Sequence, residues 1–263
     1  MPEVMAWTVD RAAGELLGRE TGRRDGGRIT DEWPELDVRT AYQVQDALLR
    51  KKIESGETLV GVKLGLTSRA KQERMGLSSP LTAWLTDAMS LPVGAPVKLD
   101  ELIHPRVEPE IVFVMRERLA GPGVTAAAAL AKVGSVHAGF EVIDSRFRDF
   151  SFALPDVVAD NASAARFVLA GTALPPEALD LALEACELEA GGEVVATATG
   201  AAVQGHPAEA LALAANSLAE RGLAIEEGWI VLTGGLTDAV FVERDRAVTA
   251  RFTNLGSLTV TGS

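Results

Sequence analysis

The sequence predicts an α+β fold, in which a mixed β-roll or barrel carries its helices on the outside. Short β-rich runs dominate the chain from about residue 107 onward, and few helical segments separate them. Because strands and helices do not alternate regularly, a doubly wound parallel sheet is disfavoured. About the first 60 residues read instead as helical, which makes them a lead-in to the β-rich part.

The helical N-terminal region is predicted to cover residues 1–58. Asp37 or Thr40 can cap a helix that runs to about Ile53, because both side chains offer an oxygen to the free N–H groups of a first turn. Gly56 follows at the position where a glycine commonly ends a helix.

The β-rich part, residues 59–263, is expected to form the catalytic unit and to integrate with the helical lead-in. Its first strand lies within residues 61–68, and the Gly191-Gly192 pair between two later runs is typical of a tight hairpin. The remaining strands are predicted at residues 107–115, 136–143, 165–170, 184–190, 193–198, 229–233, 239–243, 247–253 and 257–261.

Two helices are expected to interrupt these strands. The first covers residues 125–133 and precedes a glycine. The second covers residues 206–222, where Pro207 suits a first helical turn and Gly222 suits a C-terminal cap. Both segments are rich in alanine, which favours helix.

The composition excludes several classes of partner. The formal net charge is -12, so no basic surface is available for nucleic acid or for an anionic membrane. Cys186 is the only cysteine, which rules out intrachain disulfides and fits a reducing cytoplasm. Charges interrupt the N-terminal segment, and the longest apolar tract is too short for a bilayer. We therefore expect a soluble cytoplasmic protein without a signal peptide.

Three glutamates in two short apolar strands are the main functional signal. Glu108 and Glu110 point to the same face of one predicted strand, about 7 Å apart, because side chains alternate with period two. Glu141 lies in a second strand, and the three carboxylates converge if these strands are neighbours. An all-oxygen site of this kind suits Mg²⁺ or Mn²⁺ better than zinc. The alternative is a pair of solvated glutamates on a half-exposed strand, with Glu141 unrelated.

Lys63 is the second candidate, because its neighbours Val62 and Leu64 belong to a run that should be buried. A buried lysine is costly unless it meets an anion, so it can bind a carboxylate or polarise a carbonyl. The alternative is a lysine at a strand end whose ammonium reaches solvent. Gly61 and Gly65 flank it and would let a ligand approach the backbone.

The remaining polar segments are ambiguous at this level. Asp160, Asn161 and Ser163 form a polar loop before a strand, where such residues either bind ligands or simply build turns. The Thr-Gly-Gly turn at residues 233–235 has the same ambiguity. His104, His137 and His206 lack metal-ligand spacing and are expected to be structural, with His206 at a helix entry. No G-x-S-x-G elbow is present, so a serine nucleophile has little support.

Several motifs together resemble one known family. They are GVKLGLTSRAKQERMG, LTDAM, LIHPRVEPEIVFV, EVIDSRFRDFSFALPDVVADNASAARFVLAG, GHPAEALALAANSLAERG and VLTGGLTDAV. From about Ala41 to the C-terminus the chain resembles the 4-oxalocrotonate decarboxylase and 2-oxopent-4-enoate hydratase family, within the fumarylacetoacetate hydrolase superfamily. The resemblance implies the β-roll of that superfamily, a 2-oxo acid substrate and no nucleic-acid or membrane partner. It also implies a homo-oligomer and a complex with a related hydratase.

The resemblance assigns roles to individual residues. It implies that Glu108, Glu110 and Glu141 hold Mg²⁺ or Mn²⁺, that Lys63 is the active-site lysine, and that Ser163 lies near the substrate. In such a substrate a double bond links the departing carboxylate to the 2-oxo group. The electron pair of the broken bond can therefore move to the oxo oxygen, and no organic cofactor is needed.

Smaller signals favour the decarboxylase branch, which acts in meta-cleavage catabolism of aromatic compounds. They are IHP, GLTSRAK, IDSR and TGGLTDAV. The expected reaction converts 2-oxohex-3-enedioate to 2-hydroxypenta-2,4-dienoate and CO₂. A dianionic substrate calls for a second anion-binding group beyond the metal, and Arg146 is the candidate for it. The alternatives are a 2-hydroxypenta-2,4-dienoate hydratase and a non-catalytic partner subunit.

Overall fold

A curled mixed sheet forms the centre of the molecule and a smaller sheet packs beside it. The structure is a computed structural model that describes residues 6–68, 72 and 79–263. Within these ranges an eight-stranded sheet has the order β2-β1-β9-β4-β5-β6-β3, with β10 paired to β4. Among the named strands of the described residues, the β1–β9 and β3–β6 pairs are parallel and the other pairs are antiparallel. The predicted mixed α+β roll is thereby confirmed.

The bounds of the strands agree closely with the β-rich runs of the sequence. The eight-stranded sheet contains β1 (Leu59–Gly65), β2 (Leu81–Thr86), β3 (Ser90–Leu91), β4 (Arg106–Met115), β5 (Val133–Ile143), β6 (Ala164–Leu169), β9 (Ile230–Gly235) and β10 (Val240–Phe241). The four-stranded sheet, in the order β12-β11-β7-β8, contains β7 (Ala185–Ala190), β8 (Glu193–Thr199), β11 (Ala247–Phe252) and β12 (Ser257–Thr261).

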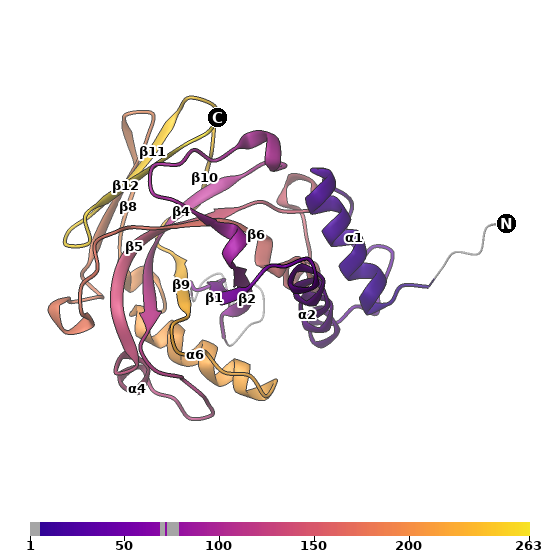
Figure 1. Cartoon of the computed structure of the whole chain (residues 1–263), viewed down its shortest axis with the longest axis horizontal. Coiled ribbons are helices and arrows are strands. Elements are labelled where there is room, and N and C mark those ends of the chain that lie inside the picture. The colour runs from indigo at the N-terminus through magenta and orange to yellow at the C-terminus, as the bar shows by residue number, and fades with distance from the viewer. Residues whose placement is uncertain (1–5, 69–71, 73–78) are drawn as a thin grey trace.

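The helices surround this arrangement. They are α1 (Val9–Gly22), α2 (Val38–Glu54), α4 (Ala126–Leu130), α5 (Leu154–Ala159) and α6 (Pro207–Glu220). Figure 1 shows α1 and α2 on one side of the large sheet and the four-stranded sheet on the opposite side. Among the described residues, no helix is long and apolar enough to span a membrane.

Local signals in the sequence define the helix ends. Asp37 is the cap of α2, because its carboxylate accepts the N–H of Thr40 at 2.7 Å. Gly56 follows the helix with φ of 106°, a conformation that favours glycine. At α6, the His206 ring accepts the N–H of Ala208 at 3.0 Å, as expected for a residue at a helix entry.

The two N-terminal helices share a buried cluster with α5. Leu16 of α1 and Leu48 of α2 belong to this cluster, together with Phe147 and Val158. The helical region therefore packs against the segment that leads into β6. The division into a region 1–58 and a unit 59–263 stays a prediction.

Four elements differ from the sequence-based expectation, and one of them is β3, a two-residue strand that was not predicted. Strand β2 was not predicted, because all of its residues are buried and the alternation that marks a half-exposed strand is absent. Helix α5 was not predicted, because it is only six residues long and depends on tertiary packing. Helix α4 ends at Leu130 and Val133 already begins β5, so the expected helix at residues 125–133 was too long.

Candidate active site and metal centre

Three carboxylates meet where β4 and β5 pair. Glu108 lies directly opposite Glu141 in the antiparallel register, and Glu110 lies opposite Gly139. One oxygen from each of the three glutamates can be chosen so that all lie within 4.8 Å of one another. Glu110 and Glu141 are buried, with 0% and 1% exposure, whereas Glu108 is half-buried. The two predicted strands are thus neighbours, as the convergence of the glutamates required.

The electrostatics of this cluster favour a bound cation. Burial, and then the charges of Glu141 and Glu108, raise the pKa of Glu110 well above its ordinary value. Within the described residues, Glu110 Oε1 and Glu141 Oε2 are buried without a hydrogen-bond donor. Such oxygens need compensation, and a divalent ion with hard oxygen ligands supplies it. The donor set therefore fits Mg²⁺ or Mn²⁺.

Strand β9 completes the cluster through the Thr-Gly-Gly segment that the sequence left ambiguous. The N–H of Gly234 donates to Glu110 Oε2 at 2.7 Å, and the Thr233 hydroxyl donates to the Ile111 carbonyl at 2.7 Å. A Cβ at Gly235 would collide with the carboxylate of Glu108. This segment is therefore part of the site, because only a glycine leaves space for Glu108.

Lys63, on β1, faces the glutamates from across β9. Its Nζ lies 3.0 Å from Glu141 Oε1 and donates to the Ala162 carbonyl at 3.0 Å. Burial lowers its pKa, but the charges of the glutamates, with Glu141 first, raise the pKa above its ordinary value. The ammonium is therefore charged in the folded protein.

The anion that a buried Lys63 requires is a carboxylate of the protein itself. Glu141 compensates its charge before any substrate is bound. Gly65 lies beside it at the cavity, whereas a Cβ at Gly61 would collide with the Ile230 carbonyl, so Gly61 serves strand packing rather than ligand access.

A cavity of about 160 Å³ opens beside these groups. Its polar lining includes Lys63, Glu108 and Ser163. Thr67 and Ser68 also line it, although the sequence showed them only as the end of a strand. The apolar lining consists of Leu64, Leu66, Leu81, Ile143, Phe150, Phe152, Val157 and Ala162. The cavity thus combines a few charged and polar groups with a mostly apolar lining, a combination suited to a small ligand with an anionic group.

The loop before β6 contributes to the site unevenly. Ser163 lines the cavity, and its hydroxyl also lies 3.4 Å from Asp160 Oδ2. Asn161 instead binds the β2 backbone, donating to the Trp84 carbonyl at 2.9 Å and accepting the Trp84 N–H at 2.8 Å. The carbonyl of Ala162, which receives Lys63, left no signal in the sequence because it belongs to the backbone.

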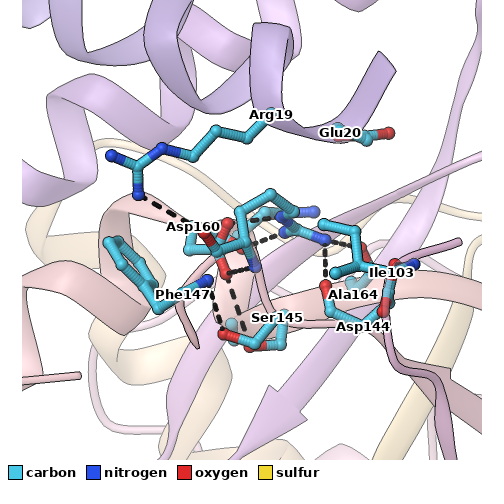
Figure 2. A network of polar contacts seen from close by, with 12 residues as sticks. Arg19, Glu20, Ile103, Asp144, Ser145, Phe147, Asp160 and Ala164 are labelled. Atoms are coloured by element: carbon cyan, nitrogen blue, oxygen red, sulfur yellow. Dashed lines mark hydrogen bonds and ion pairs between the residues drawn. The ribbon is translucent and has the colours of Figure 1, made fainter. Parts of the chain in front are cut away.

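Arg146 does not line this cavity, in contrast to the expectation of a second anion-binding group. It is 1% exposed and forms an ion pair with Asp160. Its guanidinium also donates to the carbonyls of Asp144 and Ala164, at 2.7 Å and 3.1 Å. Figure 2 shows this network around Asp160, Asp144 and Ala164. Because these partners occupy the guanidinium, direct substrate binding by Arg146 does not fit the structure.

The histidines and the GLTSRAK motif are the remaining features that the sequence singled out. The histidines are structural: His104 and His137 each contact a backbone carbonyl, that of Ser145 and that of Ala170. Part of the GLTSRAK motif, residues 69–71, lies outside the described residues.

Comparison with known proteins gives a consistent result. No protein-family model matches the chain. The chain is 42% identical over 246 residues to a 4-oxalocrotonate decarboxylase of Pseudomonas putida, covering 94% of this chain and 93% of that protein. It is 40% identical over 214 residues to a 2-hydroxyhexa-2,4-dienoate hydratase of Comamonas testosteroni, covering 81% of each. A solved structure of 4-oxalocrotonate decarboxylase from Pseudomonas putida G7, complexed with magnesium and adipate, matches with a TM-score of 0.95 and 39% identity, over 98% of this chain and 99% of that chain.

Proposed function

Because the chain belongs to the 4-oxalocrotonate decarboxylase and 2-oxopent-4-enoate hydratase family of the fumarylacetoacetate hydrolase superfamily, we propose that it is a metal-dependent carboxy-lyase. Its substrate is 2-oxohex-3-enedioate, and its products are 2-hydroxypenta-2,4-dienoate and CO₂, within meta-cleavage catabolism of aromatic compounds. The observation that carries this proposal is the convergence of Glu108, Glu110, Glu141 and Lys63 beside a cavity that Lys63 and Glu108 line.

The three glutamates would hold Mg²⁺ or Mn²⁺ at this position. When bound, such an ion supplies a Lewis acid for a 2-oxo oxygen. The buried carboxylate oxygens without a donor support this role, as does the magnesium in the similar solved structure.

The reaction itself follows from the substrate and the charged groups beside the cavity. The bond to the far carboxylate breaks, CO₂ leaves, and the electron pair moves through the double bond to the 2-oxo oxygen. A proton then adds to this oxygen and gives the hydroxydienoate. The ammonium of Lys63, fixed by Glu141 and Ala162, would stabilise the charge that develops there.

The apolar lining of the cavity supports loss of the carboxylate. With the 2-oxo acid at the metal, Ile143, Phe150, Phe152 and Val157 would contact the rest of the substrate. A carboxylate in apolar surroundings is costly, and its departure as neutral CO₂ relieves that cost. Ser163, which also lines the cavity, would donate a hydrogen bond to a substrate oxygen.

Hydration of 2-hydroxypenta-2,4-dienoate is the second candidate, because the Comamonas relative is named a hydratase. It would use the same metal and a 2-oxo acid, but it would need a positioned water and a proton donor. Decarboxylation is preferred because two Pseudomonas decarboxylases combine 42% and 43% identity with coverage of 94% of this chain. The Comamonas hydratase covers 81% of the chain, and a 2-keto-4-pentenoate hydratase that covers 95% of it is only 34% identical.

The discriminating experiment supplies purified protein and Mg²⁺ with each substrate in turn. Stoichiometric CO₂ from 2-oxohex-3-enedioate, abolished by chelator and restored by Mg²⁺ or Mn²⁺, is the expected result. Efficient formation of 4-hydroxy-2-oxopentanoate from the dienoate, with no CO₂ from the diacid, would establish the hydratase. Turnover of neither substrate would favour a non-catalytic partner subunit.

The family resemblance also supports a homo-oligomer, a complex with a related hydratase and a cytoplasmic location. These stay proposals. Light scattering of the protein, alone and mixed with such a hydratase, would test the first two.

A further inference from the structure

The loop that carries Ser163 has an unusual backbone. Asn161, Ala162 and Ser163 all adopt the left-handed region, with φ of 49°, 48° and 60°. Residues with a Cβ are unfavourable there, so such a conformation persists only where the surroundings hold it, often at functional sites. The loop supplies the Ala162 carbonyl that binds Lys63, and it places Ser163 at the cavity. Its conformation therefore sets the positions of both groups.

The guanidinium of Arg146 forms hydrogen bonds at both ends of this loop. Nε forms the ion pair with the Asp160 carboxylate, and a terminal nitrogen donates to the Asp160 carbonyl. The other terminal nitrogen donates to the carbonyls of Asp144 and Ala164. Asp160 and Ala164, both labelled in Figure 2, directly flank the three left-handed residues in the sequence. One side chain thus fixes the distance between the start and the end of the turn.

Asp160 holds the loop from its own side. Its carbonyl accepts the N–H of Ser163 at 2.9 Å, and its carboxylate accepts the N–H of Arg146 at 3.2 Å. The N–H of Asp144 also donates to the Ser163 carbonyl at 2.8 Å. The strained turn is therefore tied to the end of β5 by contacts that depend on the buried Arg146–Asp160 pair.

We propose that Arg146 and Asp160 are positioning residues, whose ion pair holds the loop in the conformation that places the Ala162 carbonyl on Lys63 and Ser163 in the cavity. Neither residue of the pair lines the cavity or belongs to the cluster of three glutamates. They therefore act on the reaction through the loop and not through the metal. For its activity readout, this inference rests on the proposed function.

The test compares two buried carboxylates that are each changed to the amide. Asp160→Asn removes the charge that pairs with Arg146 and keeps the shape of the side chain. Glu184→Gln is the matched control: Glu184 is 1% exposed and accepts hydrogen bonds from Asn254, but it does not line the cavity. For each folded variant, three quantities are measured: the affinity for Mg²⁺, the affinity of the Mg²⁺-loaded protein for adipate, and kcat with KM.

Asp160→Asn should keep the Mg²⁺ affinity, weaken adipate binding and lower kcat by about 10- to 100-fold, a loss typical of a misplaced catalytic group. Glu184→Gln should change none of the three. Parallel loss of Mg²⁺ affinity and activity, or an unchanged kcat and adipate affinity, would overturn the proposal. If Asp160→Asn does not fold, Arg146→Lys serves instead, because it keeps the charge but loses the planar fork. If the wild type turns over no 2-oxo acid, the proposed function fails, while the adipate comparison still tests the loop.

Discussion

At the scale of single residues, the site is a balance of charges in a small buried volume. When ionised, three carboxylates and the ammonium of Lys63 carry a net charge of −2, which one divalent cation neutralises. Lys63 is thus part of the structural balance as well as a candidate for substrate contact. Its ion pair with Glu141 is buried on both sides, with side-chain exposures of 4% and 1%.

We expect Lys63→Met to destabilise the metal-free protein by about 3–5 kcal/mol, because the variant leaves Glu141 buried with an uncompensated charge. Bound Mg²⁺ should recover part of this loss by supplying a positive charge next to the same carboxylate. Denaturant unfolding with and without Mg²⁺ measures both effects. Lys52→Met is the control for the recovery by Mg²⁺. It also removes a largely buried lysine from an ion pair, in this case with Glu20, which is not one of the three clustered glutamates. A metal-free Lys63→Met protein as stable as the wild type would contradict this account of Lys63.

At the scale of elements, the site depends on the close approach of β9 to β4. The Gly234-Gly235 pair, which forms the end of β9, gives an N–H to Glu110 and leaves space for Glu108. A backbone amide of this kind stabilises one carboxylate and orients it for a metal. The glycines therefore act on the metal centre without offering a ligand atom.

Gly235→Ala should weaken Mg²⁺ affinity by roughly 10- to 100-fold, the range found when a group that orients a metal ligand is lost. The new Cβ would overlap Glu108 Oε2, so the carboxylate must move. Calorimetric titration with Mg²⁺ provides the measurement. Gly171→Ala is the control, because a Cβ at that position meets nothing within 4 Å. Equal Mg²⁺ affinity in the two variants would show that Glu108 does not need this space.

The strands also show which features of the site could be predicted from the sequence alone. Period-two patterns located β4 and β5 and placed Glu108 and Glu110 on one face, because this information is local to each strand. The convergence of Glu141 with them was conditional on the pairing of β4 with β5, which the structure supplies. The pairing of Lys63 with Glu141 depends on the parallel contact of β1 with β9, which joins distant parts of the chain. Arg146 was assigned to substrate for the same reason. Its polar character was visible, but its partner Asp160 belongs to a turn whose conformation only the folded loop reveals.

At the scale of the whole molecule, an acidic protein concentrates part of its charge in its interior. The formal net charge is -12, and the buried carboxylates add repulsion that no surface counterion screens. The metal-free fold should therefore be least stable when these groups are fully ionised, and its response to pH should reveal the site.

We expect the stabilisation by Mg²⁺ to increase as the pH rises. Burial, with Glu141 and Glu108, raises the pKa of Glu110, so the protonated form stabilises the metal-free fold at low pH. This contribution is lost as the pH rises from the ordinary range of a glutamate through the raised pKa. Mg²⁺ needs the ionised carboxylate and competes with the proton for it. The stabilisation that bound Mg²⁺ gives to the fold therefore grows over the same pH interval. Thermal unfolding from mildly acidic to mildly alkaline buffers should show a widening gap in Tm between metal-loaded and metal-free protein. Glu110→Gln removes the titrating group and should flatten that dependence, whereas a gap in the wild type that is independent of pH would refute the coupling.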